Sequence, residues 1–286
     1  MMIGNEFYLL KLVPQVLRAR DFRLYTRGSG AAANGGRIVD LWQNGGAAIL
    51  GHTPPAFLRE LKNSASRGLY APFPHFLEDR YKKALSRIFP ERVFTLYAAP
   101  PPQLEKFIVE GKAALWRPFV DLNNPLAVCE KAPPVLIPVL PGISGWRGEL
   151  PLGLCILAID PKFEKELALP PYDYLPPVLL AAAARGLYDL IAFAVQRAKP
   201  QYQRIFKTLK NNDCQWQRSG LYLNPKSETT DEEWEQKFKH FLEAGFLLPP
   251  VKEHPVILPG ILSHGEEAKL AGLLAYMAEQ PSFPNP

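Results

Sequence analysis

Apolar residues recur every three or four positions over six stretches of the chain, which is the spacing of an α-helix that buries one face. In one stretch Leu77, Tyr81 and Leu85 share a face ahead of Pro90. In another, the run from residue 178 to residue 198 is rich in alanine and leucine and reads as a long buried helix. The pattern predicts helices over residues 57–65, 77–88, 104–115, 178–198, 231–244 and 264–277.

Two of these predicted helices begin with a capping box. Thr230 is followed three residues later by Glu233, and Ser263 by Glu266. In this motif the hydroxyl accepts a backbone N–H of the first turn while the acid reaches back to the N–H of the cap residue. Gly245 is expected to end the first of the two helices, because glycine readily adopts the left-handed conformation found there.

Short runs of branched and aromatic residues lie between the helical stretches and predict β-strands. They cover residues 37–42, 92–97, 135–140, 152–159 and 256–258. Strands that alternate with helices favour an α/β architecture in layers. The 286 residues, 47% of them hydrophobic, suffice for one sizeable core or for a large domain with a smaller companion.

Composition bounds the cellular setting. Uninterrupted apolar runs fall short of the roughly 20 residues of a membrane span, and Glu6 and Lys11 interrupt the apolar N-terminus, so neither a membrane nor a secretory signal is expected. The three cysteines, Cys129, Cys155 and Cys214, have no CxxC spacing, which favours a reducing, cytoplasmic location.

Charge and histidine spacing exclude further classes. The formal net charge of +5 comes from scattered basic residues, so nucleic acid is an unlikely partner, although a basic binding surface stays open as a weaker reading. The five histidines have no HExxH or comparable ligand spacing, so no metal site is predicted.

Five segments resemble one family in collinear order. They are residues 36–40 (GRIVD) with 49–54 (ILGHTP), 66–90, 177–190 (PVLLAAAARGLYDL), 238–250 (FKHFLEAGFLLPP) and 263–267 (SHGEE). Together they are similar to class III aminotransferases of the fold type I pyridoxal-phosphate family, with glutamate-1-semialdehyde aminomutases as the nearest branch.

The resemblance implies a fold and an assembly. It implies an α/β fold, namely a reduced fold type I domain of three α/β/α layers with a small α+β domain built from both termini. The boundaries it suggests are residues 1–68 for the N-terminal part of the small domain, 69–197 for the reduced large domain and 198–286 for the C-terminal part. A homodimer is expected, since subunits of the family pair and share active sites.

The family's chemistry requires a lysine that forms a Schiff base with pyridoxal phosphate, and this chain departs from that pattern. Aligned on the segment 150–153 (LPLG), Ser144 falls where the lysine belongs, and a hydroxyl cannot form an imine. The loop that cradles the phosphate with backbone N–H groups is replaced by Pro100, Pro101 and Pro102, which have none.

Two further features of the family are missing from the sequence. Residues 172–177 offer no threonine for the phosphate of a neighbouring subunit and add an acid instead. The carboxylate for the ring nitrogen has only Asp121 and Glu130 as candidates before Ser144, and neither lies in the family's context. The interval from residue 112 to 144 is too short for the family's usual strands and helices, so a block of the large domain is absent. A vestigial cleft is expected at His52, Tyr97, Ser144 and Tyr172.

These departures predict an aminotransferase-like protein that has lost pyridoxal-phosphate-dependent catalysis and binds no cofactor. Its role would be structural, regulatory or partner-binding, with a possible protein partner besides the second subunit. The alternative is an active or ligand-binding class III aminotransferase or aminomutase relative that uses the cleft between the domains, with pyridoxal phosphate as its cofactor.

Overall fold

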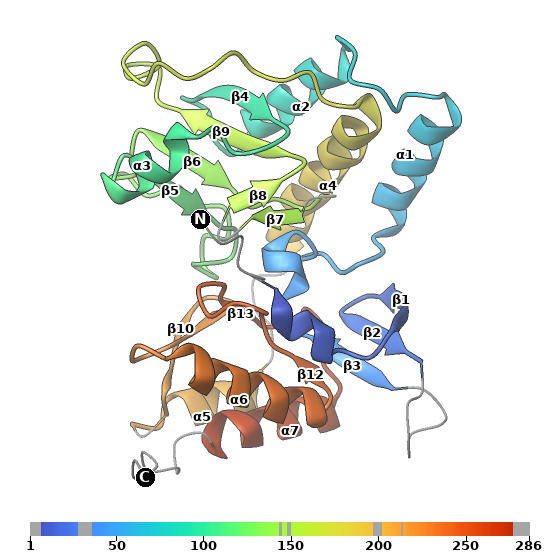
Figure 1. The fold of residues 1–286 in the computed structure, drawn as a ribbon, viewed down its shortest axis with the longest axis vertical. Helices are drawn as coiled ribbons and strands as arrows, with labels where there is room; N and C mark the ends of the chain where they lie inside the picture. The colour runs from blue at the N-terminus through green and yellow to red at the C-terminus, as the bar shows by residue number, and fades with distance from the viewer. Residues whose placement is uncertain are drawn as a thin grey trace. The chain divides into compact units, whose positions relative to one another are not determined.

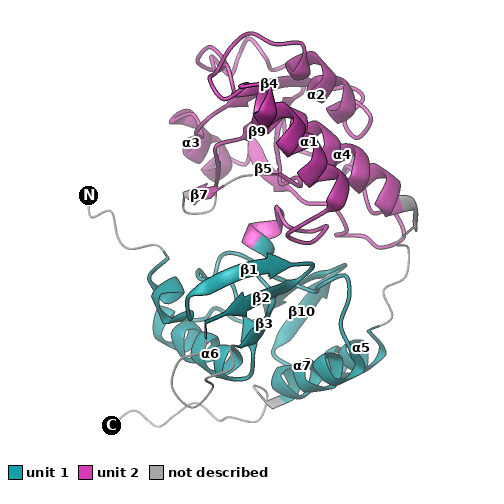
Figure 2. Cartoon of the chain, turned by 90° about the vertical axis from the view of Figure 1, so that its right-hand side faces the viewer, with its two compact units in different colours: residues 1–43, 199–286 teal, residues 44–198 magenta. Residues whose placement is uncertain are grey.

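The computed structural model describes residues 7–27, 36–142, 145–147, 150–196, 202–212 and 214–276. The chain forms two compact units (Figure 2): unit 1 from Met1–Gln43 and Lys199–Pro286, and unit 2 from Asn44–Ala198. The boundary expected after residue 68 therefore lies after Gln43 in the structure. The physical reason is that residues 55–66 form a helix that packs against the long helix 177–196 of unit 2.

Unit 2 contains helices α1 to α4 and strands β4 to β9 (Figure 1). The helices are α1 (Pro55–Ser66), α2 (Leu77–Leu85), α3 (Gln103–Val109) and α4 (Pro177–Gln196). The strands are β4 (Val93–Tyr97), β5 (Ala113–Trp116), β6 (Val135–Pro138), β7 (Gly145–Arg147), β8 (Leu150–Leu152) and β9 (Cys155–Ile159). A short kinked turn, η2 (Gln43–Gly46), in which Asn44 and Gly45 have left-handed backbone angles, spans the chain boundary between the units. The helix predicted to continue to Leu115 ends at Val109, and Leu115 lies in β5, so that extension was wrong.

The main sheet of unit 2 has the strand order β4-β9-β6-β5. Strand β9 is antiparallel to both β4 and β6, whereas β5 and β6 are parallel. It follows that β4, β5 and β6 all run in the same direction and end at the same edge of the sheet, here called the carboxyl edge. The edge where these strands begin and β9 ends is called the opposite edge.

Both faces of this sheet are buried. One face packs its alternate residues against α3 and the segment after β9, with Ile137, Leu157 and Phe107 in one buried cluster. Leu136 and Ile156 point to the other face by the two-residue alternation of a strand, and they are buried as well. A sheet covered on both faces is the layered arrangement that the alternating pattern predicted.

Helix α4 is long and apolar enough, by length and composition, to cross a membrane. Most of that stretch is buried inside the unit, however, because α4 packs against α1 and α2. A run of small residues, Ala181 to Ala184, is fully buried and lets the neighbouring helices approach closely. The helix thus has the burial of a core helix in a globular domain.

In its described residues, unit 1 combines two sheets with three α-helices and one short 3-10 helix. Its elements are η1 (Tyr8–Leu12), β1 (Val16–Arg20), β2 (Arg23–Thr26), β3 (Arg37–Asp40), α5 (Gln203–Leu209), β10 (Trp216–Ser219), β11 (Tyr222–Pro225), α6 (Asp231–Glu243), β12 (Phe246–Leu247), β13 (Val256–Ile257) and α7 (His264–Tyr276). The sheets have the orders β1-β2-β3-β12 and β10-β11-β13. The parallel pairing of β3 with β12 joins the two ends of the chain in one sheet.

Both capping boxes predicted from the sequence are confirmed. The Thr230 hydroxyl accepts the Glu233 N–H at 3.2 Å, and the Glu233 carboxylate accepts the Thr230 N–H at 3.0 Å. The same reciprocal pair joins Ser263 and Glu266, at 3.2 and 2.8 Å. The Glu266 carboxylate also accepts a hydrogen bond from the Arg23 guanidinium at 2.6 Å. This ion pair connects the start of α7 to β2.

Candidate functional site at the carboxyl edge of unit 2

The end of β4 is bonded to a proline-rich segment of its own chain. The hydroxyl of Tyr97 donates to the Pro170 carbonyl at 2.8 Å, and burial raises the pKa of this tyrosine to about 12. The next residue, Ala98, donates its N–H to the Asp173 carboxylate at 2.9 Å, and the Asp173 N–H returns a bond to the Leu96 carbonyl at 3.0 Å. A carboxylate of the protein therefore already occupies the first amide beyond β4.

Ala99 and three prolines separate this amide from α3. Helix α3 begins after Pro102, which makes no side-chain cap, and the Leu104 N–H is taken by the Pro101 carbonyl at 2.9 Å. Consecutive prolines present no N–H groups, and fixed φ angles suit them to the start of a helix. The helix therefore forms, but the loop before it cannot wrap an anion in backbone amides.

A cation stands at the end of β5. In the family that the sequence resembles, a carboxylate belongs on a strand between the phosphate helix and the lysine, and β5 is the first strand after α3. It ends at Trp116 and is followed by Arg117, whose guanidinium donates to the Gly45 carbonyl and lies 5.8 Å from the ring centre of Trp146. A guanidinium cannot accept the hydrogen bond of a protonated pyridine nitrogen.

The indole of Trp146 is buried beside the same loop. Trp146 is 6% exposed and donates its Nε1–H to the Asn44 carbonyl at 2.8 Å. Its ring lies against Gly45, where an added Cβ would be 2.8 Å from Nε1 and closer still to two ring carbons. Gly45 also has φ +64°, so glycine is required here both by the space and by the backbone. Arg117, Trp146 and the 44–45 loop thus form one packed group, here called the Trp146 plug.

The residues expected to line a vestigial cleft lie in different surroundings. His52 lines a cavity of about 130 Å³ together with Gly142 and Gly186, which is smaller than the roughly 300–1,000 Å³ of small-molecule sites. Tyr97 is buried under the Pro170 carbonyl. Tyr172 is exposed, with its ring against Tyr174 and under the Lys82 ammonium. Ser144 lies outside the described residues.

Sequence reasoning missed Arg117 and the packing of Trp146. The stretch 104–115 read as one helix, so the strand end that carries Arg117 was hidden. Gly111, with φ +70°, was the signal that could have ended the helix earlier. Among the described residues no group of three His, Cys, Asp or Glu side chains could hold a metal ion.

Comparison with known proteins shows the fold. No protein-family model matches the chain. An uncharacterized protein of Treponema pallidum is 25% identical over 88% of this chain and 91% of its own length, and one of Borreliella burgdorferi is 32% identical over 83 residues.

The solved structures that resemble the chain are aminotransferases. An ornithine aminotransferase of Plasmodium yoelii (TM-score 0.63, 11% identity) covers 93% of both chains. An omega-transaminase of Sphaerobacter thermophilus has a TM-score of 0.61 at 10% identity, covering 93% of this chain and 91% of its own. An acetylornithine aminotransferase of Elizabethkingia anophelis has a TM-score of 0.59 at 10% identity, covering 93% and 94%. The chain therefore has a reduced α/β fold like that of fold type I aminotransferases.

The residues at the carboxyl edge do not fit pyridoxal phosphate. The group requires amides or hydroxyls for its phosphate and an acid at its ring nitrogen. Where the phosphate would need donors, the chain has three prolines and the Asp173 carboxylate. Where the ring nitrogen would need an acid, it has the Arg117 guanidinium after β5. Each of these opposes the charge or the hydrogen-bonding role that the coenzyme would need.

Proposed function

We propose that this protein is an aminotransferase-like protein without pyridoxal-phosphate-dependent catalysis, whose role is to bind a protein partner, in the first instance a second copy of itself. The observation that carries the loss of catalysis is the Trp146 plug. Arg117 follows β5, the strand on which the resemblance would put a carboxylate, and its guanidinium packs with an indole two residues after Ser144 in the sequence. The Asp173 carboxylate on the Ala98 amide supports it from the phosphate side.

The test of lost catalysis is a covalent one. The purified chain is incubated with pyridoxal phosphate, reduced with borohydride, and its intact mass and peptides are measured. We expect no stoichiometric adduct on any single lysine. The variant Ser144→Lys is expected to remain unlabelled too, because restoring an amine restores neither the amides nor the carboxylate. A full adduct on one lysine of the natural chain would refute the proposal.

An exposed aromatic surface on unit 2 supports partner binding. It consists of Tyr70, Phe73, Phe76, Tyr172 and Tyr174, each between 47% and 66% exposed. Two segments contribute these rings, and they are joined by the bond from the Val178 N–H to the Leu69 carbonyl at 3.1 Å. Large apolar groups clustered on a surface mark an interaction site more often than single ones do.

We therefore propose that the second copy binds at this aromatic surface. Light scattering after size-exclusion chromatography is expected to give a dimer for the natural chain and a monomer for the double variant Phe73→Ser, Phe76→Ser. The control is Val109→Ser, because Val109 is 88% exposed but lies on α3 and outside the aromatic surface. A monomeric natural chain, or a double variant that stays dimeric, would overturn this part of the proposal.

A further inference from the structure

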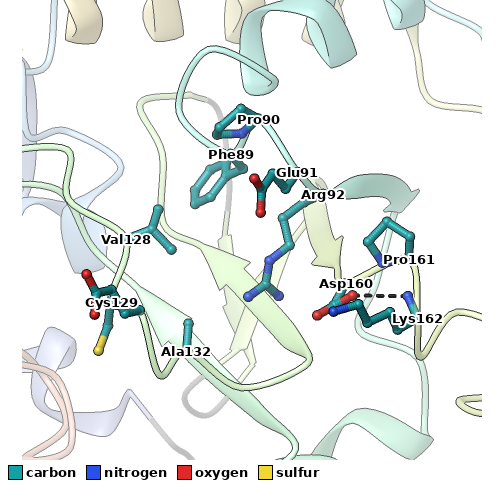
Figure 3. A pocket seen from close by; sticks show the side chains of 11 residues that line it. Phe89, Pro90, Glu91, Arg92, Val128, Cys129, Ala132, Asp160, Pro161 and Lys162 are labelled. Atoms are coloured by element: carbon teal, nitrogen blue, oxygen red, sulfur yellow. Dashed lines mark hydrogen bonds between the residues drawn. The ribbon is translucent and has the colours of Figure 1, made fainter.

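A cavity of about 450 Å³ lies at the opposite edge of the unit 2 sheet (Figure 3). Its walls come from the residues before β4, the residues before β6 and the turn after β9, which are the strand ends away from the Trp146 plug. The volume falls within the roughly 300–1,000 Å³ range of small-molecule sites. The cavity is therefore large enough for a small ligand. It is separate from the candidate site at the carboxyl edge.

The floor of this cavity is apolar. Phe89 is 1% exposed and is braced by an edge-on contact with Trp116, whose ring centre is 4.9 Å away. Val128 and Ala132 continue the apolar lining from the other wall. Such a floor suits the body of a small ligand with a hydrocarbon side chain.

Arg92 supplies a fixed cation in the cavity wall. Its Nη1 donates to the carbonyls of Pro133, Pro134 and Ala158, at 3.0, 2.7 and 3.2 Å, so the side chain is held in one orientation. The Nε and Nη2 donors make no hydrogen bond to the described residues, and the side chain lies among those that line the cavity in Figure 3. A guanidinium held on one side and open on the other is suited to a carboxylate.

Carboxylates, opposite in charge to Arg92, also line the cavity. The carboxylates of Glu91 and Glu130 are exposed and enter no ion pair in the part of the chain that is described. Asp160 also lines the cavity: its carboxylate accepts the Lys162 N–H at 3.0 Å, and its charge partly offsets the lowering of the Arg92 pKa by burial. Unengaged acids beside an oriented guanidinium offer a cation site and an anion site within one cavity.

From this arrangement we propose that the opposite-edge cavity binds a small zwitterion of the α-amino acid class, with the ligand carboxylate on Arg92, its ammonium between Glu91 and Glu130, and an apolar side chain over Phe89. A plain carboxylate would leave the two acids repelling it, and a plain amine would leave the Arg92 donors unmet. The proposal is independent of the loss of catalysis at the carboxyl edge, because no residue is shared between the two sites.

Matched probes test the two charges separately. Calorimetric titration of the full chain uses L-leucine, isopentylamine, which lacks the carboxylate, and 4-methylpentanoate, which lacks the amine, with L-phenylalanine as a second zwitterion. We expect an amino acid to bind and each single-charge analogue of leucine to bind at least about tenfold more weakly, the loss typical of one charge-assisted hydrogen bond. Binding of neither amino acid, or equal binding of 4-methylpentanoate and leucine, would overturn the proposal.

Variants assign the charges to residues. The double variant Glu91→Gln, Glu130→Gln is expected to weaken leucine about tenfold while sparing 4-methylpentanoate. Arg92→Lys is expected to weaken leucine and 4-methylpentanoate and to spare isopentylamine; if this variant does not fold, the glutamate pair still decides. The control is Glu105→Gln, an exposed acid on α3 that does not line the cavity. Unchanged leucine binding in the double variant would contradict the assignment.

Discussion

Replacing Gly45 by alanine probes the Trp146 plug directly. A Cβ at Gly45 would lie 2.8 Å from the indole Nε1 and nearer to two ring carbons, so the ring has to move. The left-handed φ of +64° adds the cost of placing alanine in that region. Gly68 is the matched control, since its φ is +73° and nothing lies within 4 Å of an added Cβ.

The magnitudes separate the two variants. Gly68→Ala carries only the backbone cost, about 1 kcal/mol. In Gly45→Ala the Trp146 hydrogen bond to Asn44 is lost as well, worth about 1 kcal/mol. Exposing about half of an indole that buries roughly 200 Å² adds about 2.5 kcal/mol at 25 cal/mol per Å². We therefore expect losses of about 4.5 kcal/mol at Gly45 and about 1 kcal/mol at Gly68.

The assay is urea unfolding followed by far-ultraviolet circular dichroism, with the free energy of unfolding obtained by linear extrapolation. Both glycines belong to unit 2, so the two variants perturb the same unit. Equal losses for the two variants would refute the packing of Trp146 on Gly45, and with it the observation on which the proposed loss of catalysis rests.

Two further predictions concern titratable groups. Burial raises the pKa of Glu266, but hydrogen bonds led by that of the Arg23 guanidinium outweigh burial and hold the pKa at about 2. The ionised carboxylate therefore stabilises unit 1 fully above about pH 4.5, and this stabilisation decreases as the pH falls toward 2. Glu266→Gln is expected to lower the free energy of unfolding by about 2 kcal/mol at pH 7, after allowance for solvent screening, and by little at pH 2; an equal loss at both pH values would contradict this. Burial raises the pKa of the Cys155 thiol to about 12, and Cys214 is also buried, whereas Cys129 is exposed. An aromatic disulfide reagent is therefore expected to modify Cys129 rapidly and the two buried thiols only on unfolding. A rapid phase that persists in the variant Cys129→Ser would contradict this prediction.

Elements fixed by neighbouring residues could be predicted from the sequence. The capping boxes at Thr230 and Ser263 need only residues three apart, and both helices begin where these motifs place them. Strand β5 could not be read in the same way, because it follows α3 after three residues and is defined by its pairing with β6, about twenty residues later. Apolar periodicity alone therefore merged a helix and a strand.

In the candidate site, too, local features could be predicted from the sequence and long-range contacts could not. The proline triplet is a local feature, and its consequence for backbone amides follows from the covalent structure of proline. The contacts of Arg117 with Gly45 and of Trp146 with Asn44 join residues 72 and 102 positions apart. No spacing rule connects such residues, so the sequence could show that the expected groups were missing but not what had replaced them.

The parallel pairing of β3 with β12 has a consequence for biosynthesis. Phe246 lies opposite Val39, and all the residues of unit 2 come between these two positions in the chain. During translation the amino-terminal strands leave the ribosome long before their partner has been made. The inserted 155-residue segment can acquire its own core in that interval, since domains generally fold as units. Until the carboxyl-terminal part emerges, the edge of β3 stays unpaired, which makes the nascent chain open to strand pairing with other molecules.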